Sequence, residues 1–160
     1  EKSVNMPKQT RFQQCVYIAL TVLLLDQISK YFVVTYLSNG PVAIIPSLNF
    51  HLAFNEGAAF GFLSTEQGWQ RWFLITVAMI MTAIILTWSA RLKAADALEN
   101  IGLGLILGGA WGNLCDRIIS GRVTDYIDFY IGNWHWYTFN VADIAICCGV
   151  AMMFWFMFKK

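Results

Sequence analysis

The chain has 160 residues, of which 58% are hydrophobic and only 13% are charged. A soluble domain carries about 25% charged residues, so this composition excludes an ordinary soluble protein and predicts one integral membrane domain over residues 1–160. The formal net charge of +1 gives no sign of the strongly basic surface that nucleic-acid binding needs.

Four stretches of the sequence are long and apolar enough to cross a bilayer, which takes about 20 mostly apolar residues in a helix. They cover residues 12–36, 72–90, 98–119 and 139–158. In the third stretch Gly104, Gly108 and Gly112 recur at steps of four, a spacing that lets a neighbouring helix approach closely. We therefore expect a membrane all-α bundle of four transmembrane helices.

Two segments between these stretches are not membrane spans. Residues 42–64 contain two short apolar runs around the Pro46-Ser47 pair, which predicts a small outward-facing β-hairpin or sheet lying on the membrane. Residues 120–138 are polar and aromatic and predict a loop.

Lysines and arginines are divided unequally between the two sides of the predicted bundle. The side of the termini and of the 91–99 connection carries seven, namely Lys2, Lys8, Arg11, Arg91, Lys93, Lys159 and Lys160. The other side carries four, namely Lys30, Arg71, Arg117 and Arg122. Because positive charges favour the cytoplasmic side, both termini are expected in the cytoplasm, with the hairpin and the 120–138 loop facing outward.

Four carboxylates are expected at a similar shallow depth near the outward face. Asp26 and Asp116 lie toward the outward ends of the first and third stretches, Asp125 lies in the following loop, and Asp143 lies near the start of the fourth stretch. Ionisable groups in membrane spans are costly and are candidate functional residues. Two carboxylates a few Å apart share a proton, so that one activates water while the other protonates a leaving group. The sequence thus predicts acid–base chemistry at this face.

Each of these polar residues also has a structural interpretation. Asp26 and Lys30 are four apart and can form a simple helical ion pair. Asn113, Asp116 and Arg117 share one helix face and can act as a polar clamp, in which Arg117 holds a loop and Asp116 holds Arg117. Asn140 can be the N-cap of the fourth helix, with Asp143 a first-turn carboxylate. Asp125 can be a solvated loop residue, and Asp128 is expected to be exposed.

Other hydrolytic chemistries find little support in the sequence. HExxH and GxSxG motifs are absent, and the four cysteines lie in apolar stretches, where they suit packing better than metal binding or disulfides. We therefore expect no metal and no cofactor.

Five ordered blocks of the sequence resemble those of the lipoprotein signal peptidases, also called signal peptidase II. They are residues 26–30 (DQISK), 55–60 (NEGAAF), 108–117 (GGAWGNLCDR), 123–128 (VTDYID) and 139–143 (FNVAD). Their order matches the family, and together they are highly specific. Thr124 stands where the family usually has valine, and Trp111 where it usually has leucine; neither change removes a chemical group.

The resemblance implies a four-helix aspartyl endopeptidase of the bacterial inner membrane, without a metal and with its active site near the periplasmic face. It implies that Asp125 and Asp143 are the catalytic pair. The residues that bind substrate or support the site by the same match are Asp26, Lys30, Asn55, Gly57, Asn113, Asp116, Arg117 and Asn140. The implied substrate is a prolipoprotein cut before its diacylglyceryl-modified cysteine. Membrane lipids and the inhibitor globomycin are the other implied partners, and nucleic acid is not one.

Two rival functions use the same features differently. A small proton-coupled membrane transporter would also carry acids within its spans, but it would spread them through the membrane depth. A non-catalytic assembly factor would explain the glycine spacing but not Asp125 together with Asp143. Cleavage of a diacylated prolipoprotein in detergent would distinguish these functions.

Overall fold

The computed structural model describes residues 8–37, 40–57, 68–92 and 97–159. It contains four helices, α1 (Lys8–Tyr36), α2 (Trp69–Arg91), α3 (Ala97–Ser120) and α4 (Val141–Lys159). Each of the four predicted apolar stretches falls on a helix, although the fourth helix begins at Val141 rather than at residue 139. In the described part of the chain, α1, α2 and α4 are long and apolar enough to cross a membrane. The 24-residue α3 carries more glycines and polar side chains, and it is the helix on which the others pack.

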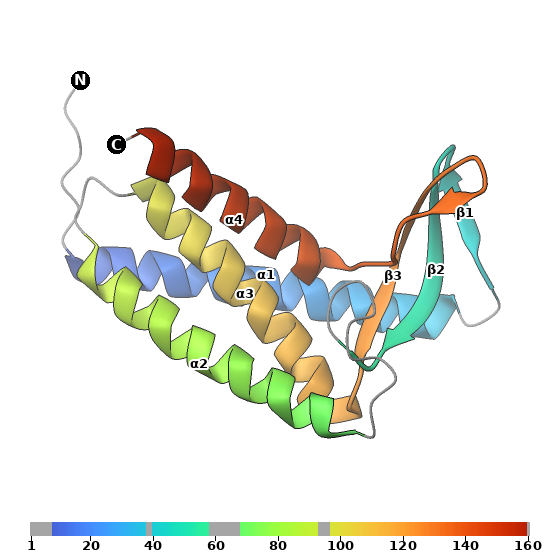
Figure 1. Cartoon of the computed structure of the whole chain (residues 1–160), viewed down its shortest axis with the longest axis horizontal. Helices are drawn as coiled ribbons and strands as arrows, with labels where there is room; N and C mark the ends of the chain where they lie inside the picture. The colour runs from blue at the N-terminus through green and yellow to red at the C-terminus, as the bar shows by residue number, and fades with distance from the viewer. Residues whose placement is uncertain (1–7, 38–39, 58–67, 93–96, 160) are drawn as a thin grey trace.

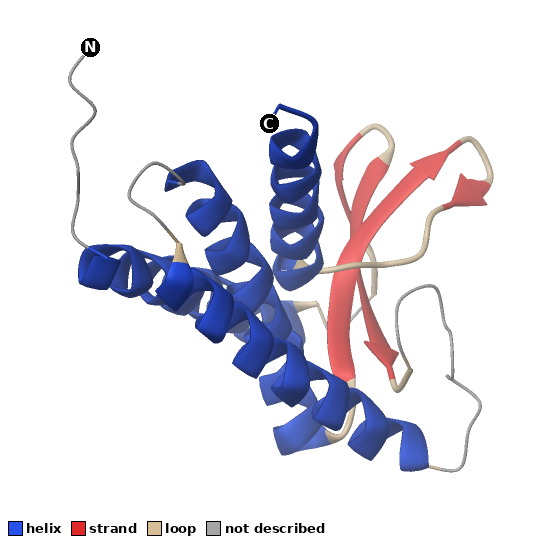
Figure 2. Cartoon of the chain, turned by 60° about the vertical axis from the view of Figure 1, so that its left-hand side comes forward, coloured by secondary structure: helices blue, strands red, loops and turns tan. Residues whose placement is uncertain are grey.

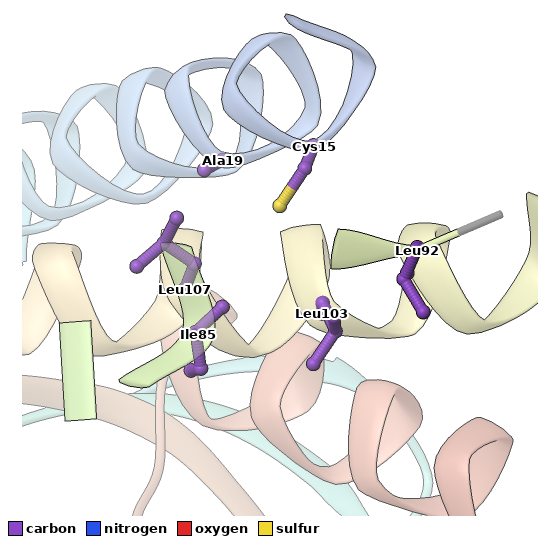
Figure 3. Packing of buried hydrophobic residues seen from close by; sticks show 6 residues of the cluster. All are labelled: Cys15, Ala19, Ile85, Leu92, Leu103 and Leu107. Atoms are coloured by element: carbon purple, nitrogen blue, oxygen red, sulfur yellow. The ribbon is translucent and has the colours of Figure 1, made fainter. Parts of the chain in front are cut away.

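The centre of the bundle is α3, because α1, α2 and α4 all lie against it (Figure 1). A compact apolar cluster joins α1, α2 and α3 at the end away from the sheet. Figure 3 shows how its side chains converge; they belong to Cys15, Ala19, Ile85, Leu92, Leu103 and Leu107. The opposite surfaces of α1, α2 and α4 expose large apolar side chains, as a lipid-facing surface does.

The predicted glycine spacing on α3 is a close-packing surface against α1. A Cβ at Gly108 would lie 2.6 Å from Cβ of Val22 and 2.7 Å from the carbonyl oxygen of Ala19. Only a glycine lets the two helices approach this closely. The same contact brings the polar residues of α1 and α3 within hydrogen-bonding distance of each other.

Replacing Gly108 by alanine is expected to lower the stability of the bundle by about 1–3 kcal/mol, because α1 must move away from α3. Gly102→Ala is the matched control on the same helix. Its Cβ would lie 3.2 Å or more from its neighbours, two of which belong to the flexible Met153 side chain. The gain in helix propensity of roughly 1 kcal/mol should offset that milder crowding. Thermal unfolding in detergent measures both, and equal melting of the two variants would contradict a steric role of Gly108.

Four antiparallel strands form a small sheet at one end of the helices, which Figure 2 shows in red. Its strands follow the order β1 (Val42–Ile45), β2 (Leu48–Asn55), β3 (Val123–Ile131) and β4 (Trp134–His135). The prediction of a small sheet around residues 42–55 is confirmed, while residues 58–64 lie outside the described residues. The prediction of a loop over residues 120–138 was wrong, because β3 pairs with β2 over most of its length.

All the strands belong to the α1–α2 and α3–α4 connections. They therefore lie at one end of the bundle, whereas α1 begins and α4 ends at the other (Figure 1). This arrangement brings the end of α3, the start of α4 and the middle of β3 together.

Candidate active site

A short backbone pairing between the sheet and the chain before α4 sets the geometry of the site. Phe139 forms an antiparallel bridge with Ile127 of β3. The Phe139 carbonyl oxygen accepts hydrogen bonds from the amides of Tyr126 and Ile127, at 3.0 and 2.8 Å. The residue after Phe139 is Asn140, the residue before α4. The pairing therefore fixes Asn140 beside the β3 residue Asp125.

Asn140 and Asp143 cap the first turn of α4 reciprocally. The Asp143 amide donates to Oδ1 of Asn140 at 3.0 Å, and the Asn140 amide donates to Oδ2 of Asp143 at 3.1 Å. A third amide of this turn, that of Ala142, donates to Oδ1 of Asp26 from α1 at 2.9 Å. These bonds satisfy N–H groups that a helix start otherwise leaves unpaired. The predicted N-cap role of Asn140 is thus confirmed, and the same bonds hold the Asp143 carboxylate in place.

Two amide side chains connect the carboxylates of Asp125 and Asp143. Nδ2 of Asn140 donates to Oδ1 of Asp125 at 2.7 Å and to Oδ1 of Asn113 at 3.1 Å. Nδ2 of Asn113 in turn donates to Oδ1 of Asp143 at 2.9 Å. Asp125 from β3 and Asp143 from α4 therefore lie in one hydrogen-bonded network. Asp125 is 3% exposed and lies on a strand, so the interpretation of a solvated loop acid was wrong.

The Asp125 carboxyl has an unusual protonation equilibrium. Burial raises its pKa to about 7, and the nearby charge of Asp143 acts in the same direction. Hydrogen bonds from Asn140 and Asn55 lower the pKa, but they offset only part of this rise. Near neutral pH this carboxyl is therefore divided between its protonated and ionised forms, as a group that both takes up and releases a proton must be.

The raised pKa predicts that Asp125 destabilises the folded protein as the pH rises. An unfolded aspartate ionises near pH 4, whereas the folded one holds its proton up to about pH 7. Between these values the folded state binds more protons, so its stability falls with increasing pH. The loss is complete above pH 7 and amounts to about 4 kcal/mol at most. The melting temperature of Asp125→Asn should therefore exceed that of the wild type by a margin that grows from pH 4 to pH 8.

Melting curves in detergent across this pH range check the prediction. Thr87→Ser is the control, because Thr87 is exposed on α2 and the change removes no ionisable group. Its difference from the wild type should not change with pH. A constant difference for Asp125→Asn as well would show that the Asp125 pKa is ordinary.

A buried ion cluster lies directly behind the network. Nζ of Lys30 is 2.7 Å from Oδ2 of Asp26 and 2.9 Å from Oδ2 of Asp116, and it donates to Oδ1 of Asn113 at 3.1 Å. Lys30 is 4% exposed and Asp26 is fully buried. The Thr124 amide donates to Oδ2 of Asp116 at 3.0 Å, which ties α3 to β3. The predicted Asp26–Lys30 pair is present.

Asp116 does not hold Arg117, contrary to the sequence prediction. Its ion-pair partner is Lys30, because the two side chains point across the α1–α3 contact rather than along α3. Arg117 instead donates from Nη2 to the carbonyl oxygen of Gly57 at 2.8 Å, so it does hold the loop after β2. Asn55 contributes to the same loop, accepting the Gly57 amide at Oδ1 at 2.9 Å. Nε of Arg117 is buried without a hydrogen-bond partner in the described part of the chain.

Three polar contacts of the site were not predicted from the sequence. Nε2 of Gln27 donates to both Asp26 and Asp116, at 3.2 and 2.9 Å. The Tyr126 hydroxyl donates to Oγ of Ser29 at 2.7 Å and joins β3 to α1. An amide within a membrane span is costly, and that signal could have identified Gln27.

The prediction that Asp128 is exposed was wrong. Its side chain is 4% exposed and hydrogen-bonded to His135 and Asn49, because β3 turns it toward its neighbouring strands. Among the described residues, its hydrogen-bond partners lie outside the network of Asp125 and Asp143. Within the described residues, no group of three or more histidine, cysteine or acidic side chains is placed to hold a metal ion.

The geometry just described can be compared with known proteins. A family model for signal peptidase (SPase) II matches residues 18–159. The chain belongs to the signal peptidase II family.

Several relatives of this family are similar over most of their length. The protein named lipoprotein signal peptidase in Hydrogenovibrio crunogenus is 48% identical to this chain, over 86% of this chain and 80% of that protein. The corresponding protein of Coxiella burnetii is 46% identical over 89% of this chain and 88% of its own. The Salmonella newport protein is 48% identical over 86% of this chain and 84% of its own.

Solved structures agree with the family assignment. Two bacterial membrane enzymes determined by the in meso method superpose on the chain with TM-scores of 0.82 and 0.80. Both are 28% identical and cover 92% of this chain, which spans 88% and 94% of theirs. The chain is thus a membrane-embedded peptidase of the signal peptidase II family, and nothing in these comparisons favours a transporter.

Proposed function

We propose that this signal peptidase II is an aspartic endopeptidase, with Asp125 and Asp143 as its catalytic pair. The supporting observation is the network in which Asn140 and Asn113 connect two carboxylates from β3 and α4. The charge of Asp143 helps to raise the pKa of Asp125, because two neighbouring carboxylates do not ionise together easily.

The unequal surroundings of the two carboxylates suggest how they divide the work. Asp125 has the raised pKa and is the better proton carrier, so it protonates the leaving amine. Asp143 accepts hydrogen bonds from Asn113 and from the start of α4, which fix the position of its carboxylate oxygens. It takes the proton of the attacking water. Arg117, which holds the carbonyl oxygen of Gly57, supports the site from α3.

The supporting residues hold this pair in position. Asp26, Lys30 and Asp116 fix α1, α3 and β3 against one another behind the pair. Asn55 and Gly57 border it on the side of β2. We propose that activity needs no metal, because these residues complete the acid–base chemistry by themselves.

The proposed substrate is a bacterial prolipoprotein, cut just before its diacylglyceryl-modified cysteine. The relatives are named for lipoproteins, and the site lies where apolar helices meet a sheet. A lipid-anchored peptide bond would lie at that depth while its signal helix stayed in the bilayer. The four helices would then span the inner membrane with both termini cytoplasmic, as the distribution of lysine and arginine indicates.

A cleavage assay with the purified chain in detergent tests this function. A prolipoprotein carrying the diacylglyceryl group should be cut before the modified cysteine, and the same protein without the group should not. Globomycin should inhibit the reaction, and EDTA should not. Equal cleavage of the proteins with and without the diacylglyceryl group would refute the proposed substrate. Loss of activity in EDTA, with recovery on adding zinc, would refute the aspartic mechanism.

A further inference from the structure

A second, polar cavity lies outside the site, at the same end of the bundle. It has a volume of about 390 Å³, which is within the range of small-ligand pockets. The first turn of α2 forms one wall, with Arg71 and Trp72, and the turn from α3 into β3 forms another, with Gly121 and Arg122. Glu56, just after β2, completes the lining. None of these residues belongs to the network of Asp125 and Asp143.

The two arginines of this cavity have no carboxylate partner within ion-pair distance in the described part of the chain. Arg71 donates from Nη2 to the carbonyl oxygen of Ile118 at 2.9 Å, while its Nε is buried with no hydrogen-bond partner among the described residues. The Arg122 guanidinium stacks on the ring of Phe54 at 3.8 Å. Stacking fixes the plane of a guanidinium and leaves its N–H donors free for an oxyanion.

The backbone around the cavity favours an anion as well. Among the described residues, α2 has no acidic side chain in its first turn. The Gly68 amide donates to Oε1 of Gln70 at 2.8 Å, a neutral acceptor that leaves the positive potential of the helix start in place. Gly121 has a φ of +79°, and a Cβ at this position would lie 3.3 Å from Nη1 of Arg71. The turn therefore leaves the space that the Arg71 guanidinium occupies.

The charge and the depth of the cavity identify the kind of anion. Two arginines and one glutamate give its lining a net charge of +1, which matches the single negative charge of a phosphodiester. Trp69 and Trp72 beside it are 50% and 64% exposed, and tryptophans of this kind lie at the headgroup level of a membrane. We propose that the cavity binds the headgroup phosphodiester of an anionic phospholipid.

Thermal unfolding of the whole chain in a neutral detergent tests the proposal, because a ligand of the folded state raises the melting temperature. Short-chain phosphatidylglycerol, short-chain phosphatidylcholine and inorganic phosphate are added at constant ionic strength. Phosphatidylglycerol should stabilise the protein, while phosphatidylcholine should do so much less, because its choline cation opposes the arginines. Inorganic phosphate at the same concentrations should have little effect.

Variants assign the effect to the cavity. Arg122→Gln, at an exposed residue, should raise the phosphatidylglycerol concentration that gives half the stabilisation on the order of ten-fold, and Arg71→Gln should act likewise if it folds. Glu56→Gln should lower that concentration. Arg91→Gln, at the opposite end of α2, is the matched control and should change nothing. An unchanged response of Arg122→Gln, or equal stabilisation by phosphatidylcholine or by inorganic phosphate, would overturn the proposal.

Discussion

Asp125→Asn and Asp143→Asn should each abolish turnover of a diacylated prolipoprotein while the protein stays folded. Asparagine keeps the size of the side chain and an oxygen that still accepts the hydrogen bonds of Asn140 and Asn113. It cannot carry the proton, so the change removes the acid–base function alone. Such catalysis typically contributes about 10²–10⁴-fold, and the loss should reach or exceed this range because one pair serves both proton transfers.

The measurement is a cleavage rate beside a melting curve for each variant. Asp128→Asn is the matched control, because Asp128 is also a buried aspartate of β3 but is bonded to His135 and Asn49. It should cleave at close to the wild-type rate once its folding is verified. Turnover by a folded Asp125→Asn or Asp143→Asn protein would remove that residue from the catalytic pair.

Lys30→Met should be the most destabilising single change in the buried ion cluster. It removes the cation from between Asp26 and Asp116 and leaves two buried carboxylates facing each other. Removing one partner of a buried ion pair costs about 3–5 kcal/mol, and here the one lysine serves both acids. Activity should fall too, because Asn113 loses the lysine that orients its amide toward Asp143.

Asp116→Asn should be much milder, because Lys30 keeps its 2.7 Å contact with Asp26. The triple change Lys30→Met, Asp26→Asn and Asp116→Asn should recover stability relative to Lys30→Met, since it leaves no unpaired charge. Melting temperatures in detergent compare the three. If Lys30→Met melted at the wild-type temperature, or if Asp116→Asn melted at a lower temperature than Lys30→Met, the lysine would not be the centre of the cluster.

The helices were predictable because a run of about 20 apolar residues has few other uses in a chain of this composition. The strand β3 was missed for the opposite reason. Its polar residues Thr124, Asp125 and Asp128 resemble a loop, although its aromatic and β-branched residues, among them Tyr126, Ile127 and Phe129, are of the types enriched in strands. Their burial comes from contacts with β2 and α3, which are distant in the sequence.

The site was predictable as a set of residues but not as a network. The family resemblance identified Asp125, Asp143 and their supports, whereas the partner of each support depends on how the helices are rotated. Asp116 and Arg117 are adjacent in the sequence, yet one contacts Lys30 of α1 and the other contacts Gly57 after β2. Spacing along one helix cannot show which neighbouring helix or loop a side chain reaches.

The reciprocal cap at the start of α4 has a consequence for the newly made protein. Asn140, Ala142 and Asp143 precede or open the last helix. Their partners lie in helices synthesised before it, because Asn140 and Asp143 are bonded to Asn113 and the Ala142 amide is bonded to Asp26. A growing chain that has inserted α1 to α3 thus lacks one carboxylate of the pair and the amide that joins them. Under the proposed mechanism, peptidase activity therefore begins only when α4 has been inserted and has docked against α1 and α3.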